Sequence, residues 1–252
     1  MDLAGKVALV TGASRRIGAA VALALGRRGA AVVVNYLERR ELAERVGADV
    51  EAAGGRALVH RADVRDRDAV RAMVERTAET FGGLDILVNN ARLAHPIRPF
   101  LELDWDGDMR SQLEVHLGGA FHCCQAAIPH MMRRGGGAIV NMVTAVFRSA
   151  GPRFHAYGPA KAALRNLTMN LAVEMGPHGI RVNSVSPTTT ETAEFPTRIT
   201  EDERRRRLRE TPLGRIATPD EVADAVVFLC TDASRYITGA DLIVSGGGLI
   251  AF

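Results

Sequence analysis

The chain has 252 residues, which is enough for one large domain with a substantial core, and its composition is that of an ordinary globular protein. Its 32 Lys and Arg residues stand against 29 Asp and Glu residues, and the net charge of +3 argues against a strongly basic nucleic-acid-binding protein. No apolar stretch approaches the roughly 18 residues that a membrane-spanning helix needs, and the N-terminus lacks a secretory signal, so we expect neither membrane insertion nor export.

Short β-branched runs alternate along the chain with longer segments of helical period, which is typical of crossover units on a parallel sheet. Apolar runs such as VALV and DILV indicate strands that helices cover on both faces. Strands are predicted at residues 7–11, 31–35, 57–60, 84–89, 138–142, 181–186 and 242–244. Helices are predicted at 17–29, 38–53, 66–81, 104–133, 156–176 and 219–231. The predicted fold class is α/β, a Rossmann-type doubly wound parallel sheet in one domain spanning residues 1–252.

The segment 187–217 is too long for an ordinary connection, and we interpret it as a substrate lid. Within it the run ERRRR follows two acidic residues, which predicts a solvated helix face with acid–Arg pairs. Binding of an anionic ligand by this run is the alternative.

The three cysteines, Cys123, Cys124 and Cys230, show neither metal-ligand spacing nor an even-numbered disulfide framework. We therefore predict no metal site and a reduced, cytoplasmic location.

The stretch TGASRRIG at residues 11–18 lies between the first predicted strand and its helix. A glycine-rich turn there lets backbone N–H groups and the helix N-terminus meet a pyrophosphate. Gly12 and Gly18 keep this geometry available, although Arg16 stands where a glycine is expected. Taken alone, the stretch is also compatible with an ordinary strand-to-helix turn.

Further motifs follow in order: ADV at residues 62–64, NNA at 89–91, YGPAK at 157–161, SP…T from Ser186 and YITGADLIVSGG from Tyr236. Together with TGASRRIG, this ordered set resembles the short-chain dehydrogenase/reductase family over essentially the whole chain. It is most similar to the NADP-dependent keto reductases of that family, including the 3-oxoacyl-carrier-protein reductase type. The resemblance implies the strand order 3-2-1-4-5-6-7, with the cofactor at the carboxyl ends of the strands. The cofactor contacts that it implies are Gly12, Ser14, Arg15, Arg16, Ile17, Gly18, Asn35, Tyr36, Arg39, Asp63, Val64, Asn90, Ala91, Tyr157, Lys161, Pro187, Thr190 and Thr192.

Tyr157 and Lys161 are four residues apart and share one face of a predicted helix. A nearby ammonium is expected to lower the tyrosine pKa from about 10, which suits a general acid and base. The resemblance implies that Tyr157 protonates the carbonyl oxygen as hydride arrives and that Lys161 also holds the nicotinamide ribose. It further implies that Thr144 stands in for the usual catalytic serine. A strand end without chemistry is the alternative for Thr144.

Three further positions depart from the family pattern. His116 replaces the asparagine that holds a relay water; an imidazole can bind this water or pass a proton itself, with a charge change near about pH 6.5, or it can be a buried structural residue. Arg92 and Thr188 replace glycines and add bulk near the nicotinamide end. Asp63 keeps the family residue that accepts from the adenine amino group, with a helix cap as its alternative.

Cofactor preference is predicted from the end of the second strand, where an acidic residue would repel a 2′-phosphate. Tyr36 stands there, and Arg15, Arg16, Arg39 and Arg40 supply local positive charge, so the sequence favours NADPH. Arg16 is expected to add an anion contact, with a solvent-facing side chain as the alternative.

The sequence therefore predicts an NADPH-dependent ketone reductase that acts on a small organic or acyl substrate. A cofactor-binding scaffold without turnover and a non-redox dehydratase or epimerase are the alternatives, because so many motif positions are altered. The resemblance implies self-association as a homotetramer or homodimer through the helices at 104–133 and 156–176. Apolar pocket walls are expected at Phe100, Trp105, Phe147, Phe154 and Phe195, with core or lid packing as the alternative.

Overall fold

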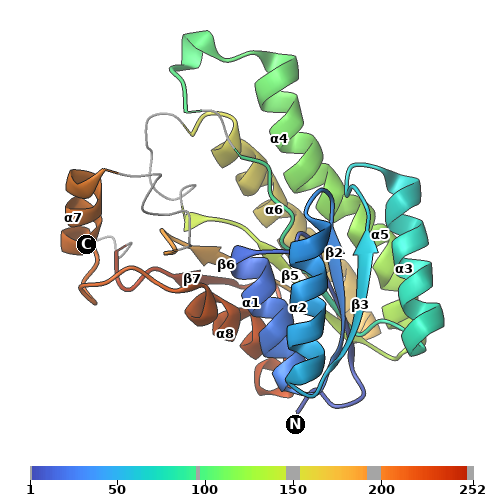
Figure 1. Ribbon diagram of the computed structural model, residues 1–252. Coiled ribbons are helices and arrows are strands. Elements are labelled where there is room, and N and C mark those ends of the chain that lie inside the picture. The colour runs from blue at the N-terminus through green and yellow to red at the C-terminus, as the bar shows by residue number, and fades with distance from the viewer. Residues whose placement is uncertain (1, 95–96, 146–153, 192–199, 249–252) are drawn as a thin grey trace.

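The computed structural model describes residues 2–94, 97–145, 154–191 and 200–248. A seven-stranded sheet crosses the molecule, with every neighbouring pair parallel and with the order β3-β2-β1-β4-β5-β6-β7 (Figure 1). The strands are β1 Val7–Val10, β2 Ala31–Tyr36, β3 Arg56–Arg61, β4 Ile86–Asn89, β5 Gly137–Met142, β6 Ile180–Pro187 and β7 Asp241–Val244. This order confirms the predicted fold class and puts the topological switch point between β1 and β4.

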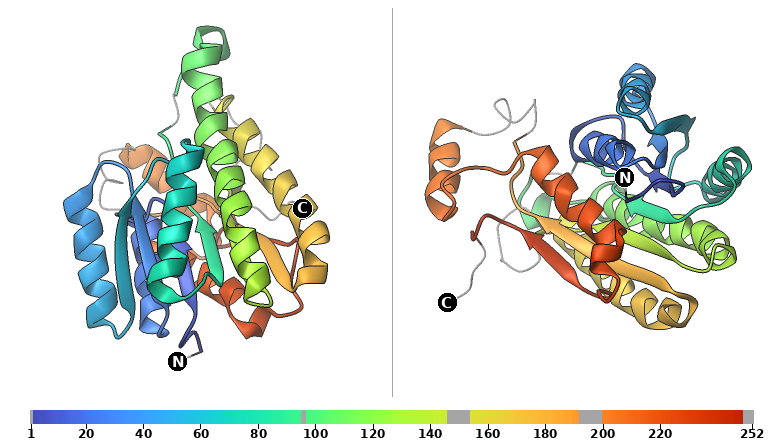
Figure 2. Two further views of the ribbon diagram at one scale, coloured as in Figure 1. Left: turned by 90° about the vertical axis from the view of Figure 1, so that its right-hand side faces the viewer. Right: turned by 90° about the horizontal axis from the view of Figure 1, so that it is seen from below.

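Helices cover both faces of the sheet, as Figure 2 shows. The α-helices are α1 Arg16–Arg27, α2 Arg40–Ala52, α3 Arg67–Phe81, α4 Ser111–Leu113, α5 Gly119–Arg133, α6 Tyr157–Met175, α7 Glu201–Glu210 and α8 Pro219–Cys230. One buried apolar cluster joins the sheet to α1, α2 and α8, and a second joins it to α3, α5 and α6. The long predicted helices are thus confirmed to within a few residues at each end.

The central strands are buried on both faces, and this explains their continuous apolar runs. In β2, Val32 and Val34 pack into the first cluster, while Ala31 and Val33 pack into the second. Successive side chains of a strand point to opposite faces, so a strand between two helical layers is apolar on both faces along most of its length.

A chain of buried polar side chains crosses the second layer. Asn89 Nδ2 of β4 donates to Asn141 Oδ1 of β5 at 2.8 Å, and Asn141 Nδ2 donates to Thr168 Oγ1 of α6 at 2.9 Å. The Thr168 hydroxyl in turn donates to the Leu164 carbonyl at 2.9 Å. The helix that begins at Tyr157 is therefore hydrogen-bonded to the middle of the sheet.

The predicted helix at 104–133 is not uniformly α-helical. Two π-helical segments, η2 Trp105–Arg110 and η3 Glu114–Gly118, precede α5, and the start of this assembly projects beyond the carboxyl ends of the strands (Figure 1). Core packing is wrong for Trp105 and Phe100, whose exposed fractions are 61% and 65%. The Phe100 ring packs edge-on against the His155 ring, with centroids 5.4 Å apart. His155 precedes Tyr157 by two residues in the sequence.

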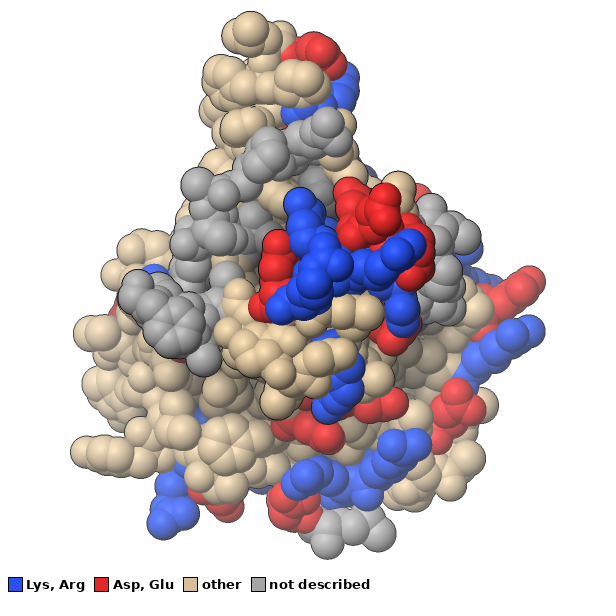
Figure 3. Space-filling view, turned by 90° about the vertical axis from the view of Figure 1, so that its left-hand side faces the viewer, with Lys and Arg blue, Asp and Glu red and all other residues tan. Residues whose placement is uncertain are grey.

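The run ERRRR lies on α7, which begins with a capping box formed by Thr200 and Glu203. Arg205 pairs with Glu201 at 3.5 Å and Arg206 with Glu210 at 3.8 Å, so the predicted acid–Arg pairing is confirmed. Figure 3 shows positive and negative side chains intermixed on the face that carries α7. None of the described helices is both long and apolar enough to cross a membrane.

Candidate active site

The turn between β1 and α1 has the backbone of a phosphate-binding loop. Gly12 adopts the left-handed region at φ 62°, and its N–H donates to Asn35 Oδ1 at 3.1 Å. The helix starts at Arg16, and its N-cap residue Arg15 makes no side-chain capping bond to the first helical turn. Amides at such a helix start are the groups that bind phosphate oxygens.

Arg16 holds the backbone conformation that the expected glycine would have. Its φ of 56° is the only positive φ at a non-glycine position among the described residues. The left-handed conformation costs a residue with a Cβ about 1 kcal/mol or more. Arg16 is half-buried, so a fully solvent-facing side chain is wrong. The substitution therefore keeps the turn and adds a guanidinium to it, at the expense of backbone strain.

The two glycines of this turn are required by its contact with the end of β4. A Cβ on Gly12 would lie 2.9 Å from Ala91 Cα, and one on Gly18 would lie 2.4 Å from Asn90 Nδ2. Asn90 Nδ2 donates to the carbonyls of Thr11 and Gly12 at 2.9 and 3.1 Å. The Thr11 hydroxyl accepts from the amides of Asn90 and Ala91 at 2.9 and 3.0 Å. The structure thus places the Asn90 amide on the phosphate turn itself.

The predicted adenosine end lies at the carboxyl ends of β2 and β3. Tyr36 is the last residue of β2 and is 8% exposed, and Asn35 Nδ2 donates to the Ala62 carbonyl at 3.1 Å. Arg65 forms a hydrogen-bonded ion pair with Asp63 at 2.6 Å, and this contact lowers the pKa of the Asp63 carboxyl. The helix-cap alternative for Asp63 is wrong, because Asp66 caps α3.

The two basic residues at the start of α2 differ in their surroundings. Arg39 is the exposed N-cap residue, whereas Arg40 pairs with Glu44 at 2.7 Å. Three more of the predicted cofactor residues lie on the turn or shortly after β3. Ser14 and Ile17 flank the turn and are half-buried, and Val64 is buried.

Four chemically active side chains meet at the start of α6. Tyr157 is its first residue, Lys161 lies one turn later, Thr144 follows β5, and His116 comes from η3. All four are buried, with exposed fractions of 9, 3, 6 and 2% in that order. Tyr157 hydrogen-bonds Thr144, and the His116 ring meets the Tyr157 ring edge-on with centroids 5.3 Å apart. The structure thus brings together the four side chains for which the sequence predicted catalytic roles.

The charges in this cluster differ from the sequence expectation. Burial raises the pKa of Tyr157, and it lowers that of Lys161 to about 7. Lys161 Nζ lies 5.9 Å from the centre of the Tyr157 ring and donates to the Met142 carbonyl at 2.6 Å. The expectation that Lys161 leaves the tyrosine with a lowered pKa is therefore wrong for the protein without ligands, because desolvation of the phenolate dominates.

Two partners of this cluster were not predicted from the sequence. Gln112 is fully buried, with its Oε1 3.1 Å from His116 Nε2 and its Nε2 donating to the Ala94 carbonyl at 3.0 Å. Its separation of four residues from His116 is the only sequence signal for this contact. Arg92 hydrogen-bonds Tyr157, although the sequence indicated only added bulk at this position.

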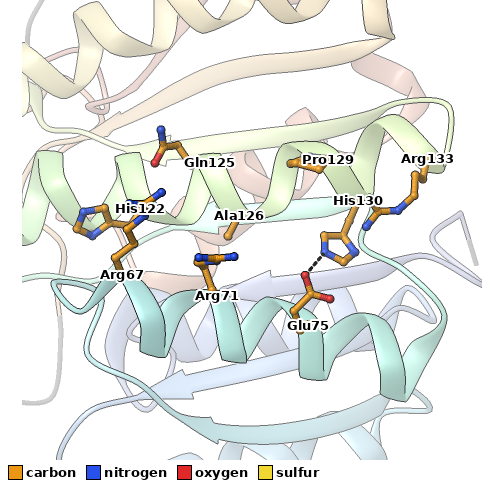
Figure 4. A pocket seen from close by; sticks show the side chains of 9 residues that line it. All are labelled: Arg67, Arg71, Glu75, His122, Gln125, Ala126, Pro129, His130 and Arg133. Atoms are coloured by element: carbon orange, nitrogen blue, oxygen red, sulfur yellow. Dashed lines mark hydrogen bonds and ion pairs between the residues drawn. The ribbon is translucent and has the colours of Figure 1, made fainter.

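A small cavity of about 10 Å³ lies beside His116 and Lys161, with Asn89 and Thr11 also in its wall. This is room for about one water molecule. A second pocket of about 400 Å³ lies between α3 and α5, and its wall contains Arg67, Arg71 and Arg133 together with the His130–Glu75 pair (Figure 4). It contains none of the predicted catalytic or cofactor residues.

The lid prediction falls partly outside the described residues, as do Thr192, Phe147 and Phe195. Pro187 ends β6, and the Thr188 amide donates to the Val244 carbonyl at 3.1 Å. Thr190 bridges to Ala217, which brings the two ends of the segment 187–217 together. Phe154 lies 6.5 Å from Tyr157 between ring centroids, so its ring is a neighbour of the predicted proton donor. The described residues contain no cluster of three or more metal-ligating side chains.

Comparison with known proteins adds relatives along almost the whole chain. The family model for enoyl-(acyl carrier protein) reductase matches residues 12–248. The chain is 42% identical to cis-4-hydroxycyclohexanecarboxylate dehydrogenase of Sinomonas cyclohexanicum over 247 residues, which is 97% of this chain and 96% of that protein. It is 36% identical to 3-oxoacyl-(acyl-carrier-protein) reductase of Staphylococcus aureus over 244 residues, which is 96% and 97% of the two proteins.

A solved structure of 7α-hydroxysteroid dehydrogenase, in complex with NADH and 7-oxo glycochenodeoxycholic acid, superposes with a TM-score of 0.93. The identity is 32%, and the match covers 98% of this chain and 95% of that one. With the glycine turn at the switch point and the Tyr157–Lys161 helix beside it, the chain belongs to the short-chain dehydrogenase/reductase family, which binds a nicotinamide cofactor, and it is an oxidoreductase of alcohol and ketone groups.

Proposed function

We propose that the protein is an NADPH-dependent reductase of a ketone group in a small organic or acyl substrate, with Tyr157 as the general acid. The observation that carries the proposal is the buried contact of Tyr157 with Thr144 beside Lys161, at the carboxyl edge of the sheet. In such a dry site a hydroxyl proton is exchanged with a substrate oxygen and is not lost to water.

The residues of the turn fit a dinucleotide, because Gly12 leaves the turn without a Cβ that would meet Ala91 and because the uncapped first turn of α1 presents backbone amides. Arg15 and Arg16 would hold the pyrophosphate or the 2′-phosphate, and Lys161 would hold the nicotinamide ribose. When bound, the nicotinamide supplies the hydride. The proposal for NADPH over NADH rests on Tyr36, which replaces an acidic residue at the end of β2.

The protein's own part in the reaction is proton transfer and orientation. The Thr144 hydroxyl donates a hydrogen bond to the substrate carbonyl oxygen and fixes its position. The Tyr157 hydroxyl gives its proton to the same oxygen, and the burial that keeps Tyr157 protonated suits this direction. In the reverse direction Tyr157 must be a phenolate, and a donor or a positive charge close to Oη is then required.

His116 is proposed to lie on the route by which Tyr157 regains its proton. Its ring touches the Tyr157 ring, and the cavity that it shares with Lys161 has room for about one water molecule. A water there could bridge Lys161 Nζ and the imidazole, which matches the role that the family gives to an asparagine.

Self-association and location are proposed on similar grounds. Phe121 of α5 and Val173 of α6 are exposed at 44 and 80%, which supports a homotetramer or homodimer through these helices. Sedimentation would show a monomer if this is wrong. The three cysteines are free and buried, as suits a protein of the reducing cytoplasm, and cell fractionation tests this location.

The test combines binding and turnover. Calorimetry at moderate salt should give NADPH a dissociation constant at least about tenfold lower than that of NADH, which one charge-assisted phosphate contact can supply. Turnover is followed by nicotinamide absorbance with 4-oxocyclohexanecarboxylate, an acetoacetyl thioester and a 7-oxosteroid, the three ketone classes that the named relatives suggest.

The matched variant is Tyr157→Phe, which keeps the ring and removes the hydroxyl. It should lower kcat at least about a hundredfold and leave NADPH affinity nearly unchanged. Equal kcat in the two proteins would refute the assignment of Tyr157. NADPH binding without turnover of any ketone would favour a scaffold, and product formation without net nicotinamide change would favour a dehydratase or an epimerase.

A further inference from the structure

Arg92 is held at the edge of the candidate site by hydrogen bonds of the loop that carries it. Before it, the amides of Asn90 and Ala91 donate to the Thr11 hydroxyl at 2.9 and 3.0 Å. After it, the Ala94 carbonyl accepts from Gln112 Nε2 at 3.0 Å. Both ends of the segment 90–94 are thus attached to elements of the site, so the place of Arg92 is determined by the fold.

The Arg92 side chain reaches Tyr157, the residue proposed to exchange a proton with substrate. Arg92 hydrogen-bonds the Tyr157 hydroxyl, which is also the partner of Thr144. A guanidinium has donors only, so Tyr157 Oη must be the acceptor in this bond. The tyrosine proton is then directed away from Arg92, toward the Thr144 side where the substrate oxygen is proposed to bind.

Three charged or titratable side chains face Tyr157 from three elements. Arg92 comes from the loop after β4, His116 from η3 and Lys161 from α6 itself. Lys161 is 3% exposed, and burial together with the Arg92 charge lowers its pKa to about 7. A guanidinium stays charged throughout the working pH range, whereas Lys161 loses charge within it.

We propose that Arg92 is a catalytic residue of this site. It stabilises the Tyr157 phenolate through a charge-assisted hydrogen bond and orients the tyrosine proton toward the substrate. The inference rests on the proposed role of Tyr157 as proton donor. It assigns to Arg92 the positive charge that the sequence pattern alone would assign to Lys161. The lowering effect of Arg92 on the pKa of Tyr157 agrees with this assignment.

The substitution Arg92→Gly introduces the residue that the family pattern predicts here and removes both the charge and the donor. Arg92→Lys keeps the charge, and Arg92→Gln keeps a donor without the charge. Arg92 is an exposed residue, so the three variants should fold. Arg76→Gln is the matched control, because Arg76 is an exposed arginine on α3 whose ion pair with Glu79 is far from this cluster in sequence and fold.

The first readout is phenolate formation, measured by ultraviolet difference titration of each protein against the same protein carrying Tyr157→Phe. Loss of Arg92 should move the Tyr157 midpoint upward by about one pH unit or more, since an opposite charge in contact has effects of this size. Arg92→Gln should move it nearly as far, Arg92→Lys less, and Arg76→Gln should leave it unchanged. Equal midpoints for wild type and Arg92→Gly would overturn the inference, as would equal shifts for Arg92→Gly and Arg92→Lys.

The second readout is the pH dependence of kcat/KM for oxidation of cyclohexanol or 4-hydroxycyclohexanecarboxylate. The rising limb should move upward with the phenolate midpoint, so the rate at a fixed pH below it should fall about tenfold in Arg92→Gly. A limb that stays in place while the phenolate midpoint moves would show that Arg92 is not catalytic. If no alcohol or ketone is turned over, the proposed function fails by itself, and the titration still decides whether Arg92 controls the Tyr157 phenolate.

Discussion

Arg16 offers a direct test of how the phosphate turn is built, because its backbone conformation lowers stability whereas its side chain is proposed to contact an anion. The left-handed φ of 56° costs a residue with a Cβ about 1–2 kcal/mol, and glycine avoids this cost. Glycine also loses about 0.5–1 kcal/mol through the greater freedom of the unfolded chain. Arg16→Gly should therefore be more stable than Arg16→Ala by roughly 1 kcal/mol. Both variants lack the guanidinium, so both should bind NADPH more weakly.

The assay is unfolding of wild type, Arg16→Gly and Arg16→Ala in guanidinium chloride, with NADPH affinity measured by calorimetry on the same samples. For a chain of this length, about 1 kcal/mol corresponds to roughly 2–4 °C in melting temperature, which is a second measure. Comparing the two variants isolates the backbone term, because the missing side-chain contacts are the same to within one methyl group. An Arg16→Gly protein no more stable than Arg16→Ala would refute the strain argument, and unchanged NADPH affinity in both would refute the anion contact.

Two further predictions concern the buried cluster. Because the pKa of Lys161 falls from 10.5 to about 7 on folding, the unfolded chain binds more protons between these pH values, and the free energy of unfolding should rise by a few kcal/mol from about pH 7 to about pH 10. Urea unfolding of Lys161→Met should lack this rise, and an equal rise in wild type and Lys161→Met would contradict the burial argument. If His116 lies on the proton route, His116→Asn should retain turnover, whereas His116→Leu should lower kcat about tenfold or more, since leucine leaves the polar cavity without a hydrogen-bonding group. Equal kcat in both variants would show that His116 has only a structural role.

The hydrophobic period of the sequence predicted the layered sheet well, because β1 and β2 are buried on both faces and are apolar along most of their length. It could not predict the π-helical segments around His116, since segments of six and five residues are too short to show a period of their own. It also left core packing open for Trp105, although the helix that carries Trp105 projects beyond the sheet.

The sequence identified the members of the candidate site but not their electrostatics. The spacing of Tyr157 and Lys161 shows that they share a helix face, yet it contains no information on desolvation, which raises one pKa and lowers the other. The contact between Arg92 and Tyr157 joins positions 65 residues apart, and only the fold brings them together. Gln112 was missed for the same reason, because its partner Ala94 lies in a loop of unpredictable path.

The buried hydrogen bonds that run from Asn89 through Asn141 to Thr168 fix more than the distance between α6 and the sheet. Apolar contacts lose little when a helix rotates by a few degrees about its axis, whereas hydrogen bonds depend on direction. Rotation of α6 would swing Tyr157 Oη sideways across the reacting carbonyl, where an error of about 1 Å is expensive. The direction of the Tyr157 hydroxyl is thus fixed by three polar side chains that lie inside the protein and that a substrate would not reach.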